Sequence, residues 1–150
     1  MTIRTLVTLV AVMSLGCNNS FCTEEVAMTA IRIHLLPMEY ETYAPVTRSS
    51  IETEATCQFT QGIGGAVGLL RRLLKEAKSG AFDNDIVRVK IVGLERRPVF
   101  IDKEGGIWRG DGKSARLTRE GLAKLREVLQ ELERDLPEAC PDEPPWQESN

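Results

Sequence analysis

Alternation of apolar and polar side chains predicts a half-buried strand over residues 30–36, which Pro37 ends. Its apolar face comprises Ile31, Ile33 and Leu35. Its other face comprises Arg32, His34 and Leu36. After a loop, residues 46–59 have the pattern of a polar second strand or of two short strands. The pattern of residues 30–59 therefore predicts antiparallel strands with one buried face.

Two later segments carry apolar residues at the three- and four-residue spacing of an amphipathic helix. The first spans residues 62–79, and Gly80 can end it in a left-handed conformation. The second begins after Thr118, whose hydroxyl can cap the first turn, and ends before Pro137. The apolar stripe of the first comprises Ile63, Val67, Leu70, Leu73, Leu74 and Ala77. That of the second comprises Leu122, Leu125, Leu129, Leu132 and Leu136.

Three strands are predicted between these helices. Residues 86–92 alternate, with Val87, Val89 and Ile91 on one face. Residues 98–102 and 107–109 follow, joined by a turn at Gly105-Gly106. The element order is β-β-α-β-β-β-α. Because each leucine row must be buried, the expected fold class is α+β, an antiparallel sheet with two amphipathic helices packed on one face.

The opening of the chain is typical of a secretory leader. Arg4 precedes an uncharged run over residues 5–15, which is shorter than the roughly 20 apolar residues that span a membrane. We expect a signal peptide at 1–16, a polar tether at 17–28, a single α+β domain at 29–136 and a Pro-rich acidic tail at 137–150. The tail is expected to be disordered unless Cys140 fixes it. The protein is thus predicted to be exported, either to the periplasm or beyond the cell.

Cys17 stands where such a leader is cut. Leu15-Gly16-Cys17 resembles the bacterial lipobox, which implies that diacylglyceryl is attached to the Cys17 sulfur before cleavage. Ser14 occupies the place that usually holds leucine in the lipobox, and Ser14 with Gly16 also suits a general signal peptidase. A lipid-anchored protein and a soluble exported protein both remain open. Only the lipid on Cys17 would attach the protein to a membrane.

The other cysteines suggest disulfide chemistry. Cys22, Cys57 and Cys140 are candidates because exported proteins fold where thiols can pair. The preferred bridge joins Cys57 to Cys140, since it would tie the tail to the domain. The sequence cannot choose among the connectivities, and unpaired cysteines remain an alternative. No pair has the CxxC spacing of a redox site or a zinc knuckle, and His34 is the only histidine. We expect no metal and no cofactor.

Charge is unevenly distributed along the chain. Residues 62–126 hold fifteen basic and eight acidic side chains, whereas residues 127–150 hold one basic and eight acidic. A basic middle could attract an anionic partner, or the acidic tail could lie near it.

Four glycines open the first helix, where backbone amides can bind phosphate, but Val67 stands at the third glycine position of that motif. Close approach of the helix to the sheet is the favoured explanation for these glycines.

The function predicted from these patterns is non-catalytic binding. A possible recognition patch combines two aromatic residues with two cations on the hairpin formed by residues 98–109: Trp108, Arg109, Lys103 and Phe100. The partner would be another envelope or secreted protein or an anionic envelope polymer, and not a nucleic acid. A secreted peptidase inhibitor is one alternative. An envelope hydrolase with a carboxylate-only site, such as Asp102 with Glu104, is another.

Overall fold

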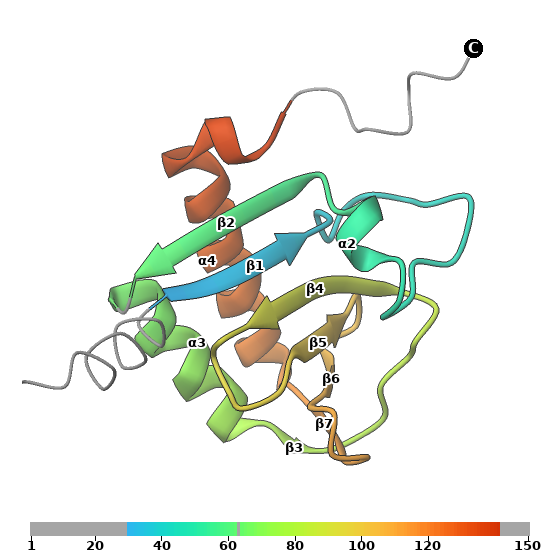
Figure 1. The fold of residues 1–150 in the computed structure, drawn as a ribbon. Helices are drawn as coiled ribbons and strands as arrows, with labels where there is room; N and C mark the ends of the chain where they lie inside the picture. Colours follow the sequence, from blue (N-terminus) through green and yellow to red (C-terminus); the bar gives the residue numbers. More distant parts are fainter. Residues whose placement is uncertain (1–29, 63, 142–150) are drawn as a thin grey trace, which may run out of the picture.

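The computed structural model describes residues 30–62 and 64–141, which form one sheet of seven strands with two longer helices behind it (Figure 1). The strands are β1 (Ala30–Leu35), β2 (Cys57–Gly62), β3 (Lys78–Ser79), β4 (Val87–Val92), β5 (Val99–Asp102), β6 (Gly106–Trp108) and β7 (Ser114–Arg116). The helices are α2 (Ile51–Glu54), α3 (Gly65–Glu76), α4 (Arg119–Asp135) and the 3-10 helix η1 (Pro137–Ala139).

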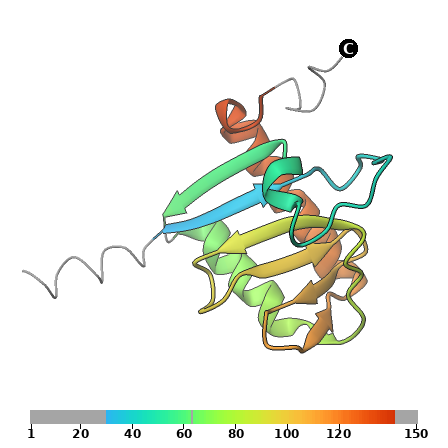
Figure 2. The same ribbon diagram turned by 45° about the vertical axis from the view of Figure 1, so that its right-hand side comes forward.

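The strands lie in the order β2-β1-β4-β5-β6-β7-β3, and all six pairings are antiparallel. Both α3 and α4 cover the same face of the sheet, as Figures 1 and 2 show from two directions. The predicted α+β class, with two amphipathic helices on one face of an antiparallel sheet, is therefore confirmed. We call the face away from α3 and α4 the open face.

The main core lies between the sheet and these two helices. Ile33, Ile91 and Ile101 project from the strands, and the leucine stripes of α3 and α4 meet them. The buried stripe residues are Val67, Leu70, Leu73 and Leu74 of α3 and Leu125, Leu129 and Leu132 of α4. Thr118 caps α4 as predicted, because its Oγ1 accepts a hydrogen bond from the Gly121 N–H at 3.0 Å.

The first helix is shorter than the range predicted for it. It ends at Glu76, and the chain turns extended at Ala77 so that Lys78 and Ser79 pair with Arg116 and Ala115 as β3. The extra strand β7 was also missing from the prediction. Both strands are too short to show an alternation in sequence.

The region predicted as a strand over residues 46–59 contains a helix as well. Ser50 donates its N–H to the Thr47 carbonyl, and the short helix α2 follows, with Ile51 completely buried. Only from Cys57 does the chain become the strand β2, which runs beside β1 to Gly62. The prediction of one or two strands up to residue 59 is therefore wrong for its first half, since local turn bonds start a helix there.

A bulge in β4 changes the face on which Val87 lies. Val87 pairs with Asp102 and Val89 with Ile101, so Arg88 is an extra residue between them. Val89 and Ile91 face the helices as predicted. Val87 instead packs on the open face with Phe100. The prediction that Val87 shares a face with Val89 and Ile91 is therefore wrong, because the inserted residue Arg88 moves Val87 to the opposite face of the sheet.

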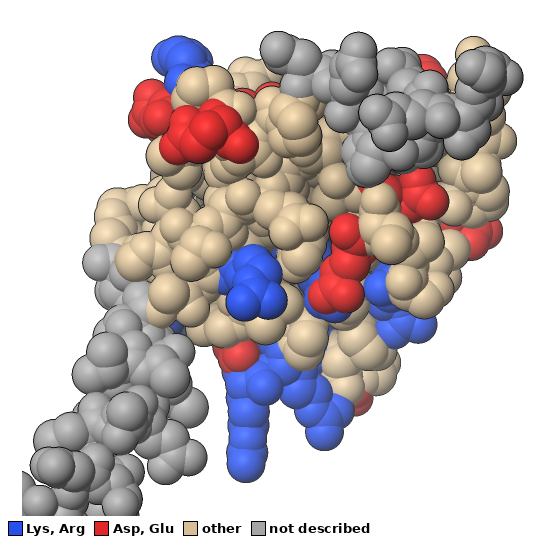
Figure 3. Space-filling model, turned by 45° about the horizontal axis from the view of Figure 1, so that its top comes forward, with Lys and Arg blue, Asp and Glu red and all other residues tan. Residues whose placement is uncertain are grey.

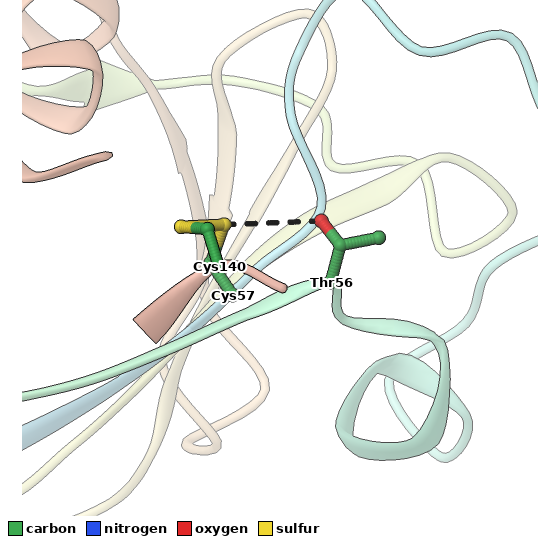
Figure 4. Close-up of a disulfide and its surroundings, with 3 residues drawn as sticks. All are labelled: Thr56, Cys57 and Cys140. Atoms are coloured by element: carbon green, nitrogen blue, oxygen red, sulfur yellow. Dashed lines mark hydrogen bonds between the residues drawn. A yellow bond between two sulfur atoms is a disulfide. The ribbon is translucent and has the colours of Figure 1, made fainter. Parts of the chain in front are cut away.

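The predicted disulfide between Cys57 and Cys140 is present (Figure 4). It joins the first residue of β2 to the segment after η1, and the Thr56 hydroxyl lies 3.9 Å from the Cys57 sulfur. The bridge fixes the tail as far as the structure describes it, to residue 141. The predicted leader, the tether, Cys17, Cys22 and residues 142–150 lie outside the described residues. No helix within residues 30–62 and 64–141 has the length and apolar character needed to cross a membrane.

The glycines at the start of α3 do not serve close packing. A Cβ atom added at Gly62, Gly65 or Gly68 would meet no described atom within 4 Å. At Gly64 it would meet only the Gly62 carbonyl, at 3.9 Å. The expectation that these residues bring the helix close to the sheet is therefore wrong, because each leaves room for a side chain.

Candidate functional site

An apolar cavity of the open face lies under the loop of residues 36–46, which we call the 36–46 loop. Its volume is about 260 Å³. It is lined by Leu36, Glu41, Thr42, Tyr43, Ala44, Pro45, Val46 and Glu54. Tyr43 is fully exposed, although a large aromatic side chain is more often at least half-buried in a folded protein.

Both ends of the 36–46 loop are fixed to the sheet. Leu36 donates its N–H to the Arg88 carbonyl at 2.8 Å as β1 ends before Pro37. At the other end, Val46 donates to the Asp85 carbonyl and accepts from the Val87 N–H, which forms a short parallel bridge. Anchoring at both ends restricts the conformations of the loop, which reduces the ordering needed when a ligand binds.

A buried arginine supports the middle of the same loop. Arg88 is 2% exposed, and its guanidinium donates to the carbonyl of Tyr40 at 3.1 Å and to that of Val87 at 3.1 Å. Burial lowers the pKa of Arg88, and nearby Glu41 opposes that shift. Hydrogen bonds to two carbonyl oxygens partly replace the lost hydration of the guanidinium.

A second apolar cluster lies beneath α2 and continues toward the hairpin. Ile51, Leu36, Val46, Val87 and Phe100 are buried together there, with Phe82 and Trp108 partly buried against them. The Phe100 and Trp108 rings meet edge to face, with centroids 5.7 Å apart. Both α2 and the 36–46 loop pack on the sheet through this cluster, because Ile51 belongs to α2 and Leu36 and Val46 are the first and last residues of the loop.

The cations on this aromatic pair are not the predicted ones. The Arg48 guanidinium lies 3.9 Å from the centroid of Trp108, and Lys90 Nζ lies 5.5 Å from that of Phe100. Arg48 also donates its Nε–H to the Asn84 amide oxygen at 2.8 Å. Arg48 comes from the segment before α2, and Lys90 lies on β4 directly opposite Phe100, so spacing within the β5–β6 hairpin could not reveal either cation.

The structure brings together only two of the four residues of the predicted patch. Phe100 and Trp108 touch, whereas Lys103 bonds Glu41 at 2.7 Å. Arg109 lies on the helix side, where it donates to the Leu74 carbonyl of α3 and approaches Glu95 at 3.7 Å. Neighbours in a strand point to opposite faces, and this alternation separates Arg109 from Trp108.

His34 lies beside an ion pair on the open face. Lys90 Nζ is 2.5 Å from Glu52 Oε1, and His34 Nε2 is 4.0 Å from the same oxygen. Burial lowers the pKa of His34, Glu52 opposes the shift, and Lys90 and Arg32 add to it. The hydrogen bond from Lys90 lowers the pKa of Glu52. Neither ring nitrogen of His34 has a hydrogen-bond partner among the described residues.

Asp102, a carboxylate considered for acid-base chemistry, holds the backbone instead. Its Oδ1 accepts the N–H groups of Glu104 at 2.8 Å and Gly106 at 2.7 Å, and its Oδ2 accepts that of Asp83 at 2.8 Å. A Cβ at Gly106 would lie 2.2 Å from Asp102 Oδ2, so only glycine fits beside the carboxylate. The partner proposed for Asp102, Glu104, is exposed.

Another carboxylate pair lies between α4 and the start of the 36–46 loop. Burial, with a smaller contribution from Glu39, raises the pKa of Glu133. The cavity that both residues line measures about 10 Å³, which is room for a single water molecule.

Within the described part of the chain, no three His, Cys, Asp or Glu side chains are grouped so that they could hold a metal ion.

Comparison of this chain with protein-family models, curated proteins and solved structures found no match.

Proposed function

We propose that this is an exported, non-catalytic binding protein whose cavity under the 36–46 loop takes an apolar side chain of another envelope or secreted protein. The observation that carries this proposal is the apolar cavity of about 260 Å³ beside the fully exposed Tyr43. Tyrosine offers a large contact area and a hydroxyl with little entropy to lose, which is why it is enriched at protein interfaces.

Export is supported by the leader pattern and by the covalent bridge. Residues 5–15 are uncharged and precede a sequence that resembles a lipobox at Cys17. The Cys57–Cys140 disulfide suits an oxidising compartment, since cytosolic thiols are kept reduced. A lipid on Cys17 would hold the domain at a membrane surface, and cleavage without lipidation would release it.

The charged groups of the open face favour a protein over an anionic polymer as partner. Lys90 is engaged by Glu52, and Lys103 is engaged by Glu41. Arg48 stacks on Trp108 and bonds Asn84. Arg32 is exposed on the same face, but an anionic polymer that bound these three cations would have to displace their contacts. An apolar side chain enters the cavity without breaking any of them.

Site-specific photo-crosslinking tests the binding site. A benzoylphenylalanine at position 43 should form a covalent adduct with one partner protein in the producing cell, and Ala44→Trp, which fills the cavity, should abolish that adduct. Position 40 on the same loop does not line the cavity and provides the matched control. Equal adducts at positions 40 and 43, or an adduct that survives Ala44→Trp, would contradict the proposal.

Intact-mass analysis of the purified protein tests export separately. A chain that begins at Cys17 with a diacylglyceryl adduct supports the lipid anchor, and a chain cut near the same position without lipid supports release. A chain that retains residues 1–16 would show that the leader prediction is wrong, whatever the crosslinking shows.

A further inference from the structure

The two edges of the sheet differ in how well they are protected. β3 forms one edge, has only two residues and carries Lys78. β2 forms the other edge, has six residues and contains no charged residue and no proline. Natural sheets usually protect a long edge with charges, prolines or bulges, because its outward N–H and C=O groups can pair with another chain. β2 is paired on one side by β1 without a register shift, and within the described residues no strand pairs with its other side. η1 packs against β2 beside the bridge at Cys57, so the edge open to pairing is the part after that residue.

β2 is also held in the conformation that an added strand needs. Its first residue, Cys57, is bonded to Cys140, and Cys57 and Phe59 are buried in the main core. Gln58 and Thr60 are exposed on the open face. A fixed extended strand offers its outward hydrogen-bonding groups without further loss of backbone entropy.

The surroundings of this edge are acidic on the helix side. The end of α4 and η1 extend beyond β2 in both ribbon views (Figures 1 and 2). Glu131, Asp135 and Glu138 are exposed there, and Arg134 is the one cation in residues 127–141. Figure 3 shows acidic side chains at the upper left with a basic side chain above them, beside a broad surface with few charges, and further acidic side chains at the right of the view.

We propose that the β2 edge binds an extended, basic segment of a partner protein as an additional strand. Backbone hydrogen bonds along Gln58 to Gln61 would hold the segment, and its lysine or arginine side chains would meet the acidic end of α4. This contact is independent of the cavity under the 36–46 loop. A second copy of the chain fits less well, because it would bring another acidic α4 end to the same edge.

Backbone amide exchange measured by NMR tests the proposal with a defined probe. The probe is a synthetic heptapeptide that alternates lysine with valine, used at concentrations up to about 1 mM. It should slow exchange of the β2 amides, and its binding should weaken as salt rises. The same peptide with alternate backbone amides methylated should not bind, since it cannot complete the ladder. A glutamate–valine peptide should bind at least several-fold more weakly.

Paired variants locate the contact. Gln58→Lys places a charge on β2 and should weaken peptide binding roughly two- to fivefold, whereas Thr53→Lys adds the same charge on α2 and should leave binding unchanged. Likewise Glu138→Gln should weaken binding, and Glu120→Gln at the other end of α4 should not. Unchanged β2 exchange, equal binding of the methylated or the acidic peptide, or a concentration-dependent dimer that protects β2 without peptide would each overturn the proposal. None of these outcomes bears on crosslinking at position 43.

Discussion

The two faces of the sheet bury very different side chains. Between the sheet and the helices α3 and α4, the core cluster is made of aliphatic residues with Phe59, Met38 and Cys57. The open face buries a smaller apolar cluster under α2 and the 36–46 loop, and it also carries three of the four buried polar side chains. These are His34, Arg88 and Asp102.

This difference suggests that the two faces have different roles, with the helix-covered face contributing most of the stability and the open face carrying the candidate binding site. Burying an apolar side chain stabilises the fold, whereas burying a polar one costs free energy unless all its hydrogen bonds are made. Both ring nitrogens of His34 and the Nε atoms of Arg88, Arg109 and Arg126 lack a partner among the described residues. Such groups therefore occur on both sides of the sheet, but those of the open face belong to the more deeply buried residues, His34 and Arg88. Such groups are more often found where a surface binds or responds.

The largest expected effect concerns the Cys57–Cys140 disulfide, which lies on the helix-covered side of the sheet. Replacing Cys57 and Cys140 together by serine should lower the free energy of unfolding by about 4 kcal/mol, because the bridge closes a loop with a sequence separation of 83 residues. Urea unfolding of the variant and of the oxidised and reduced wild type measures this loss. The reduced wild type should match the variant. A change below about 1 kcal/mol would mean that α4 holds β2 without the bridge.

Truncating one isoleucine on each face compares the two cores directly. Ile33→Ala should cost about 4 kcal/mol, since Ile33 is completely buried among strands and helices that cannot collapse into the space. Ile51→Ala should cost about 2 kcal/mol, because the short helix α2 and its loop can relax. Urea unfolding of both variants provides the comparison. Equal losses would show that the open-face cluster is as rigid as the main core.

Sequence patterns predict the face that follows a regular period. The leucine spacing of α3 and α4 and the alternation in β1 are sufficient to predict the layers, because those residues share one apolar environment. The bridge between Cys57 and Cys140 was the preferred pairing once export was assumed, although the sequence could not choose among the possible connectivities. Local hydrogen bonds at Thr47 and Ser50 override the strand pattern and start α2, which no hydrophobic period signals.

The open face could not be predicted in the same way. Its contacts join residues far apart in the sequence, such as Arg48 with Trp108 and Lys90 with Glu52. The bulge at Arg88 reverses the expected direction of Val87, and a bulge leaves little trace in composition. The cavity under the 36–46 loop depends on where that loop returns to β4, which is a tertiary contact.

The next effect is a pH dependence that arises from His34 on the open face. Burial lowers the pKa of His34 in the folded protein, so the unfolded chain takes up its proton first as pH falls below the ordinary value of 6.5. The free energy of unfolding should therefore fall as pH drops through about 6.5, until the folded protein is protonated as well. Glu52, whose pKa is lowered from 4.5, contributes in a separate window at lower pH.

Urea unfolding of His34→Gln from pH about 7.5 to about 5.5 isolates this effect. The variant keeps a polar side chain but does not titrate, so its stability should vary less over this range than that of the wild type. Ile33→Ala, on the other face, should keep the wild-type slope. Parallel curves for wild type and His34→Gln would show that His34 is solvated in the folded protein.

The smallest expected effect concerns the cation over the aromatic pair. Arg48→Ala should lower stability by about 1 kcal/mol, because it removes the contact of the guanidinium with Trp108 and the hydrogen bond to Asn84. Arg32→Ala, an exposed arginine on the same face, should change stability by less than about 0.5 kcal/mol.

A double-mutant cycle of Arg48→Ala with Trp108→Leu separates the stacking energy from the hydrogen bond, since only the stacking is lost in both single variants. A coupling energy of about 0.5 kcal/mol is the expected value for a half-exposed pair. Zero coupling would mean that Arg48 contributes through Asn84 alone. In that case a cation from a partner would replace Arg48 over Trp108 without loss of stacking energy, and the open face would offer a second contact beside the cavity.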